Sequence, residues 1–104
     1  MADGAGIGPG TAVDTRPVPL NRPRPNYTER ARKNSVQGVI RLRVLIDVDG
    51  SVKDVQLLTH LPDGLDDEAA KAARQLRFRP ATRGGQPVKF WQVLEVEFNL
   101  RAKR

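Results

Sequence analysis

The clearest pattern along the chain is an alternation of apolar and polar positions in residues 40–48. The apolar positions of one face are Ile40, Leu42, Val44, Ile46 and Val48. A period of two predicts a β-strand with one buried face. Asp49-Gly50 follows this strand, and this dipeptide is typical of tight hairpin turns. We therefore predict an antiparallel hairpin whose second strand runs from Val52 to about Thr59.

A helix with a single apolar stripe is predicted after the hairpin. Its apolar residues, spaced at i, i+4, i+7, i+8 and i+11, are Leu65, Ala69, Ala72, Ala73 and Leu76. Acidic residues at 66–68 begin the helix and basic residues at Arg74 and Arg77 end it, as the helix dipole favours. The small alanines would let this helix lie close to a sheet. We expect Pro80 to stop the helix and Gly84-Gly85 to form a turn.

Two more elements complete the predicted fold. A short helix is expected between Tyr27 and Asn34, with Thr28 as its N-cap. A long last strand is expected over residues 87–100, with a possible bulge near Phe90-Trp91, where the alternation is unclear. The order helix, strand, strand, helix, strand predicts an α+β fold. In it, two helices pack on one face of a three-stranded antiparallel sheet.

Proline and glycine are concentrated at the start of the chain. Residues 1–25 hold five of the eight prolines and four of the nine glycines, with few large apolar residues. Such a segment buries too little apolar surface to fold and is typical of a semi-extended linker. We therefore predict a disordered Pro/Gly-rich linker over residues 1–25 and a single folded domain over residues 26–104.

The charge of the chain is basic but evenly spread. Residues 1–34 hold six Lys/Arg against three Asp/Glu, and residues 35–104 hold twelve against nine, so each part contributes +3 to the net charge of +6. A nucleic-acid binder usually clusters its basic residues on one face and exposes aromatic rings for stacking. The scattered charges and the small aromatic content leave a basic nucleic-acid-binding domain as a minor alternative.

No group of residues supports catalysis or metal binding. His60 is the one histidine and there is no cysteine, so neither a zinc site nor a catalytic triad can be assembled. The stretch "DVDGSVKDV" lacks the closing glutamate of a calcium-binding loop. Gly84-Gly85 is not followed by the helix that a phosphate-binding loop requires. We expect no enzymatic activity, no metal and no cofactor.

No stretch of the sequence has the composition of a membrane-crossing helix. Such a helix needs about 20 consecutive apolar residues, whereas the longest uninterrupted aliphatic run is Val44-Leu45-Ile46. The start "MADGAGIGPG" lacks the basic region and the apolar region of a signal peptide. We expect neither a spanning helix nor a signal peptide in this sequence.

The last strand is the remaining candidate for function. A sheet of three strands leaves an open edge unless another segment covers it, and an open edge can bind an extended partner by strand addition. Glu95 and Glu97 on the outward face could equally be charges that protect the edge from unwanted pairing. The residues alone leave both interpretations open.

Three stretches of the sequence together resemble the TonB C-terminal domain family. They are "RPNYTERARKNSVQGVIRLRVLIDVDGSVKDVQLL", "GLDDEAAKAARQLRFRPA" and "GQPVKFWQVLEVEFNL". The matching positions are Pro25, Tyr27, Ala31, Gln37-Gly38, Asp47 to Gly50, Phe78 and Pro80-Ala81. Thr28 replaces a usual proline and Leu76 replaces a common tryptophan. The resemblance covers residues 25 to about 100, nearly all of the predicted domain.

This resemblance implies a non-catalytic, periplasmic, protein-binding domain of a TonB-like energy transducer. Such a domain couples inner-membrane energy to TonB-dependent outer-membrane transporters, whose TonB-box segment adds to its last strand. It also implies a link to the inner-membrane motor complex through an N-terminal membrane anchor outside these residues. The same fold serving as an envelope protein-interaction or homodimerisation module, with a different partner, stays open as an alternative.

The resemblance also implies which residues meet the partner. Phe78 would be a buried core residue with Arg77 and Arg79 pointing outward on either side. Secondary contacts would come from two residues that precede the first helix, Arg24 and Asn26. The main contacts would come from the last strand and its approach: Gln86, Val88, Lys89, Phe90, Trp91, Gln92, Val93, Leu94, Glu95 and Val96.

Overall fold

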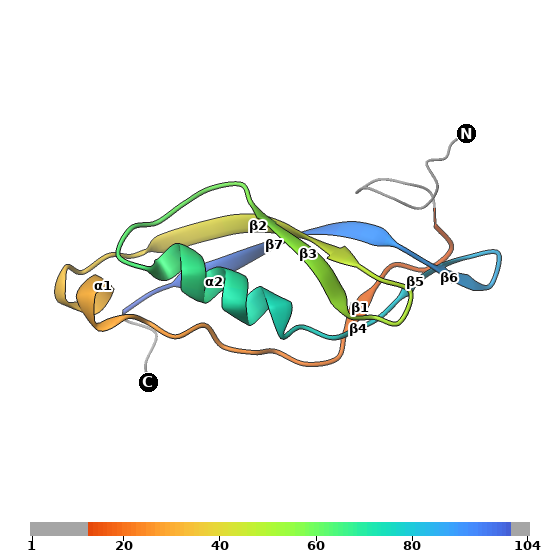
Figure 1. Cartoon of the computed structure of the whole chain (residues 1–104), viewed down its shortest axis with the longest axis horizontal. Helices are drawn as coiled ribbons and strands as arrows, with labels where there is room; N and C mark the ends of the chain where they lie inside the picture. Colours follow the sequence, from red (N-terminus) through yellow and green to blue (C-terminus); the bar gives the residue numbers. More distant parts are fainter. Residues whose placement is uncertain (1–12, 101–104) are drawn as a thin grey trace.

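The computed structural model describes residues 13–100, which form an elongated body of 50 × 24 × 18 Å. Two helices and several antiparallel strands make it an α+β fold, and its three long strands form one sheet in the order β3-β2-β7. In chain order the elements are β1 (Val18–Pro19), α1 (Glu29–Lys33), β2 (Gly38–Ile46), β3 (Val52–Leu57), α2 (Leu65–Arg74), β4 (Phe78–Arg79), β5 (Ala81–Arg83), β6 (Gln86–Val88) and β7 (Phe90–Phe98) (Figure 1).

The alternating residues of β2 explain its place at the centre of the sheet. The side chains of its inner face are fully buried: Ile40, Leu42, Val44 and Ile46. The strand pairs antiparallel with β3 on one side and with β7 on the other. Val48, expected to continue this buried face, is 46% exposed because β2 ends at Ile46 and the turn begins.

The bulge expected near Phe90-Trp91 is absent. The register between β2 and β7 runs without a shift from Gly38 opposite Phe98 to Ile46 opposite Phe90. The irregularity lies instead between β2 and β3, where the pairing passes over Lys53 next to the hairpin turn. Because β7 is regular, its even-numbered residues face the core and Trp91 lies on the opposite face of the sheet.

Helix α2 packs mainly against β3 and also meets β2. The expected alanine stripe is buried, and Leu65, Ala69 and Ala73 belong to the core. The prediction that Pro80 stops the helix is wrong. The helix ends at Arg74. Gln75 caps it, because its backbone N–H donates to the carbonyl of Ala72, three residues earlier. The chain then becomes extended, because Phe78 and Arg79 pair with β1.

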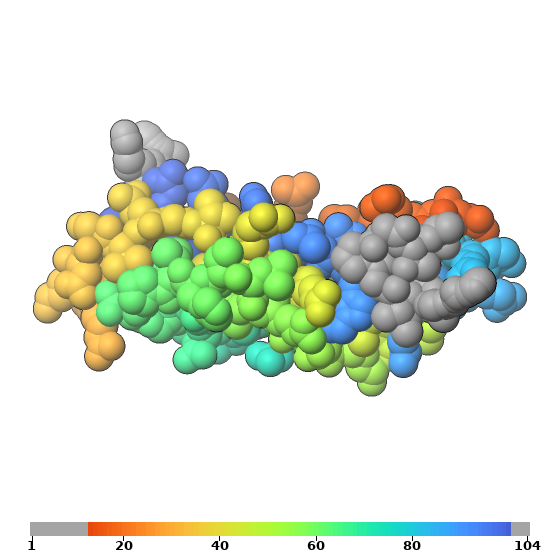
Figure 2. Space-filling view, turned by 90° about the horizontal axis from the view of Figure 1, so that it is seen from above, coloured from red at the N-terminus to blue at the C-terminus, as the bar shows by residue number. Residues whose placement is uncertain are grey.

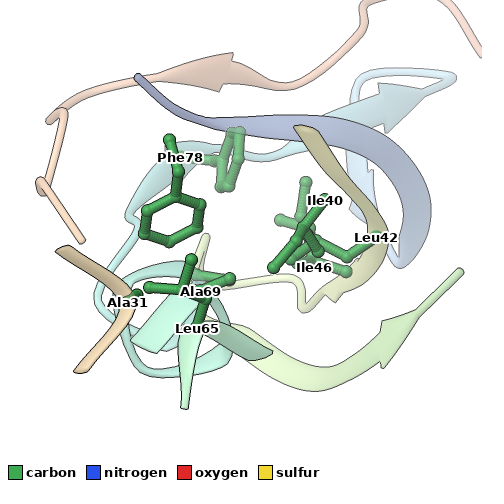
Figure 3. Close-up of a cluster of buried hydrophobic side chains, with 10 residues drawn as sticks. Ala31, Ile40, Leu42, Ile46, Leu65, Ala69 and Phe78 are labelled. Carbon is green, nitrogen blue, oxygen red and sulfur yellow. The ribbon is translucent and has the colours of Figure 1, made fainter. Parts of the chain in front are cut away.

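The core lies between the inner face of the sheet and the two helices. Figure 3 shows Phe78 facing Leu65 and Ala69 of α2, with Ile40, Leu42 and Ile46 approaching from the sheet. Phe78 is only 4% exposed, so the expectation that it fills the core is confirmed.

Helix α1 is short, and side-chain contacts attach it to the neighbouring parts of the fold. The Thr28 hydroxyl accepts a bond from the Ala31 N–H at 3.0 Å, as an N-cap does, and donates to the Asp63 carbonyl at 2.7 Å. The Tyr27 ring meets the Phe98 ring edge-on at 5.5 Å, and its hydroxyl donates to the carbonyl of Val36. The start of α1 is thereby fixed to the end of β7 and to the loop before α2.

The segment expected to be a linker is described from residue 13 onward, and residues 1–12 of that prediction lie outside the described residues. Its described part makes specific contacts. Val18 and Pro19 pair with Arg79 and Phe78, and Thr15 forms a bridge with Thr82. Figure 2 shows these red residues against the cyan hairpin of β5 and β6 at one end of the molecule. A domain boundary at residue 26 stays a prediction.

The glycine of the β2-β3 turn generates a prediction about stability. Gly50 has φ +87° and is buried, and a Cβ on it would lie 1.9 Å from the carbonyl oxygen of Phe78. Gly84 has φ +59° but open space around it. Gly84→Ala should therefore lower the free energy of unfolding only by the penalty of a left-handed backbone, about 1–2 kcal/mol. Gly50→Ala should lower it by clearly more, because its Cβ would also clash. Urea unfolding of both variants measures this, and equal losses would contradict the close approach.

Candidate functional site

Strand β7 lies at the edge of the sheet. Its nine residues pair with β2 on one side, and no backbone hydrogen bond among residues 13–100 reaches its other side. An extended strand in this position presents a row of N–H and C=O groups to whatever lies beside it. The candidate site is therefore built along this edge.

The hydrogen bonds of β2 determine which groups of β7 face outward. The N–H of Leu58 donates to the carbonyl of Arg41 at 2.7 Å, so the peptide groups of Arg41 point toward β3. Peptide groups alternate in direction along a strand, so the even-numbered residues of β2 bond to β7 and pair with its even-numbered residues. The groups left over on the free edge of β7 belong to Trp91, Val93, Glu95 and Glu97.

The outer face of the sheet carries a polar and aromatic surface. Trp91 lies opposite Leu45, and the guanidinium of Arg43 lies 4.7 Å from the centre of its ring. Arg43 also donates to the Gln56 side chain at 2.7 Å. Glu95 forms an exposed ion pair with Arg41 at 3.6 Å. Both helices lie on the opposite face, so these contacts keep the outer face ordered without a covering layer.

The inner face of β7 is less covered than that of β2. Phe90 and Phe98 are buried at its two ends, at 1% and 2% exposure. Gln92, Leu94 and Val96 between them are only half-buried, because α2 packs over β3 and β2. This strip, two of whose three residues are apolar, directly adjoins the free edge.

A groove runs along this strip, and we name it the edge groove. Its two main hollows have volumes of about 310 Å³ each and meet at Pro19, Leu76 and Leu94. The end of α2 forms one wall, through Ala72 and Ala73. The opposite wall is the extended segment Thr15 to Pro25, which we name the strap. Its lining residues in the two hollows are Arg16, Pro17, Pro19, Asn21, Arg22, Pro23 and Pro25.

The strap is held by hydrogen bonds to the chain that follows α2. The Asn21 side chain donates to the carbonyl of Gln75 and accepts from the N–H of Arg77, both at 2.9 Å. The N–H of Leu20 donates to the Arg77 carbonyl at 2.8 Å. At the N-terminal end of the strap, the hydroxyl groups of Thr15 and Thr82 form a hydrogen bond of 2.8 Å. None of the strap's backbone hydrogen bonds in the described chain goes to β7.

The structure separates the residues expected to meet a partner. Seven of them, Phe90 to Val96, lie on β7. Lys89 lies in the break before β7, while Gln86 and Val88 belong to β6 and already pair with Arg83 and Ala81. Arg24 lies on the strap and lines a third hollow of about 280 Å³ with Glu97 and Phe98. Asn26 is exposed just before α1 and lines none of these three hollows.

Sequence reasoning missed the residues that form the rest of the groove. Leu76 and the prolines of the strap line it, and Asn21 holds the strap in place. The spacing of the prolines was an available signal, because proline at every second position of an extended segment is typical of an edge that cannot donate hydrogen bonds.

The acidic residues and the histidine elsewhere serve local structure. His60 is exposed and lies 2.8 Å from Asp66. Asp49 accepts bonds from the hydroxyl and the N–H of Ser51, and these bonds hold its pKa below the ordinary value. Within residues 13–100 there is no cluster of three or more His, Asp or Glu that could hold a metal ion. None of the described helices is long and apolar enough to span a bilayer.

Comparisons with known proteins agree on one family. The family model described as "Gram-negative bacterial TonB protein C-terminal" matches residues 23–100. Protein TonB of Pseudomonas aeruginosa is 31% identical over 85 residues, which cover 81% of this chain and 25% of that protein. Protein TonB of Escherichia coli K12 is 31% identical over 84 residues, covering 80% of this chain and 35% of that protein.

The solved structures include a relative of the same shape. The solution NMR structure of the Pseudomonas aeruginosa TonB CTD superposes with a TM-score of 0.69 at 25% identity, covering 98% of this chain and 100% of that chain. This chain spans a quarter to about a third of the length of the two curated relatives. The matched family model, the relatives and the shared fold together show that the chain belongs to the TonB C-terminal domain family.

Proposed function

We propose that the chain is the periplasmic C-terminal domain of a TonB-like energy transducer. In this proposal it binds TonB-dependent outer-membrane transporters and has no catalytic activity of its own. The inner-membrane anchor and the contact with the motor complex would belong to parts of the protein outside this sequence. Membership of the family supports the class of function. The observation that carries the mode of binding is the free edge of β7.

The transporter's TonB-box segment would bind by adding a fourth strand beside β7. Its backbone would bond to the peptide groups of Trp91, Val93, Glu95 and Glu97, which face the free edge. Each such bond contributes about 0.5–1.5 kcal/mol net, so several in a row are needed for useful affinity. Side chains on one face of the guest would enter the edge groove, and those on the other would lie beside Trp91 and Val93.

This arrangement refines the expected contacts. Residues Phe90 to Val96 stay in the proposed site, with the odd-numbered positions bonding and with Gln92, Leu94 and Val96 forming the floor of the groove. Arg24 stays as a contact near the end of β7, and Asn26 as a contact before α1. Lys89 would contact the guest only through its side chain. The two residues of β6, Gln86 and Val88, would contact it through side chains or through the side of β6 that faces away from β5.

A second candidate uses the same edge with a different partner. Two copies of β7 could pair antiparallel across a two-fold axis and form one continuous sheet, because the same unpaired groups are present in each copy. Sedimentation at several protein concentrations separates the candidates. A mass that doubles with concentration, and a guest peptide that reverses the doubling, would favour self-pairing as the competing use of the edge.

Titration with a TonB-box peptide tests the proposed function directly. We expect amide shifts concentrated on residues 90–98 of isotope-labelled protein, and slower hydrogen exchange at Val93 and Glu95 as their N–H groups gain partners. A peptide of the same composition in scrambled order serves as the control. Shifts confined to other parts of the molecule, or no shifts at all, would refute strand addition at β7.

A substitution at Val93 tests the bonding pattern. Val93→Pro removes one N–H from the free edge but none from the β2-β7 ladder, a position that edge strands tolerate. We expect peptide affinity to fall by about 1–2 kcal/mol, or roughly 5- to 30-fold. Val93→Ala keeps the N–H and should retain most of the affinity. Isothermal titration measures both, with urea unfolding to verify the fold, and equal affinities for the two variants would contradict the assignment.

A further inference from the structure

We propose that the strap is a removable guard of the edge groove. It walls the groove in the partner-free protein and must leave before a guest strand pairs with β7, and Asn21 is the clasp that sets how readily it leaves. This inference rests on the proposed function, because it concerns access to the same edge. Three features of the strap carry it: its position, its prolines and its attachment.

The strap borders the place that a guest strand needs. An added strand lies about 4.8 Å from its neighbour in the plane of the sheet. Glu95, whose peptide groups face the free edge, lines the same hollow as Pro19 and Pro23 of the strap. The strap follows β7 in the same direction, from Pro17 near Gln92 to Pro25 near Phe98. A guest strand and the strap therefore compete for one strip of surface.

The prolines prevent the strap from pairing with the strand that it covers. The N–H of Leu20 bonds to Arg77, so the even-numbered side of the extended strap points toward β4. The odd-numbered side, which points away from β4, carries Pro17 and Pro19, and Pro23 and Pro25 line the same groove. Proline has no N–H to give to a ladder. The strap thus shields the edge without the bonds that would make the cover permanent.

The attachment of the strap lies away from the edge and is modest in strength. Beside the groove it consists of the two-residue pairing of β1 with β4, the two bonds of the Asn21 side chain and the bond from Leu20, and Leu20 is 59% exposed. Exposed hydrogen bonds of this kind are individually weak in net terms. The guard can therefore open without unfolding the core, because these bonds reach only residues 75–79 and none goes to the three-stranded sheet.

If a covered site must open before it binds, the apparent affinity is reduced by the fraction of molecules that are open. Asn21→Ala deletes two bonds that exist only in the closed state, so it should raise the affinity for a TonB-box peptide roughly tenfold. Asn34→Ala is the matched control, because it removes one exposed bond, to Asp63, far from the groove. Its affinity should equal that of the wild type.

A second variant should move the affinity in the opposite direction. Replacing Pro17 and Pro19 together by alanine gives the strap two N–H groups on the side that faces the groove. The strap can then pair with β7, and peptide affinity should fall several-fold. Hydrogen exchange gives an independent readout in the wild type, because the Leu20 amide should exchange faster when peptide is bound while the Val93 amide exchanges more slowly.

The outcomes separate the guard from the proposed function. If the wild type binds peptide at β7 and Asn21→Ala binds no more tightly, or more weakly, the guard is refuted and strand addition stands. If Leu20 stays protected while peptide is bound at β7, the strap does not leave and the guard is again refuted. If neither the wild type nor Asn21→Ala binds peptide, strand addition itself is refuted, and the guard falls with it.

Discussion

The ladder between β2 and β7 is the constraint on which the rest of the structure depends. Its register is unbroken over nine residue pairs, so the directions of all peptide groups in β7 follow from those of β2. Because β2 also bonds to β3, its peptide groups form ladder hydrogen bonds on both sides. Within the described chain, those of β7 form them on one side only. The buried residues of β2 fix this register, since a slip by one residue would turn Ile40 and Leu42 out of the core.

The edge of the sheet is open because few bulky side chains cover β7. Helix α2 packs through alanines and mainly against β3, so the inner face of β7 is less covered than that of β2. Exposed edges invite aggregation, and charged side chains are one protection. Glu95 and Glu97 supply such charges here, and the strap adds a second protection that leaves the backbone of β7 unpaired. Protection and accessibility are thus combined on the same strand.

Local patterns were sufficient to predict the long elements. The period of two in β2, the Asp49-Gly50 turn and the alanine stripe of α2 each act within a few residues, and each has its counterpart in the structure. Apart from Val48, which lies in the turn after β2, the errors concern pairings between distant residues. Strands β1 and β4 have two residues each, too short to show a period, and their pairing makes the chain extended after α2, before Pro80 is reached. The clasp of Asn21 joins residues more than fifty positions apart, which no spacing rule reveals. The free edge itself was predictable from the number of strands, and the groove beside it was not.

The contact between Tyr27 and Phe98 has a mechanical consequence. The strap leads directly into Tyr27, and the ring of Tyr27 rests on the last residue of β7. A pull on the chain ahead of α1 therefore reaches the sheet at one end of its edge strand and acts along the length of that strand. Under such shear the bonds between β7 and its neighbours share the load, whereas a sideways pull would unzip them one by one. The fold is thus suited to transmit tension to a strand held beside β7.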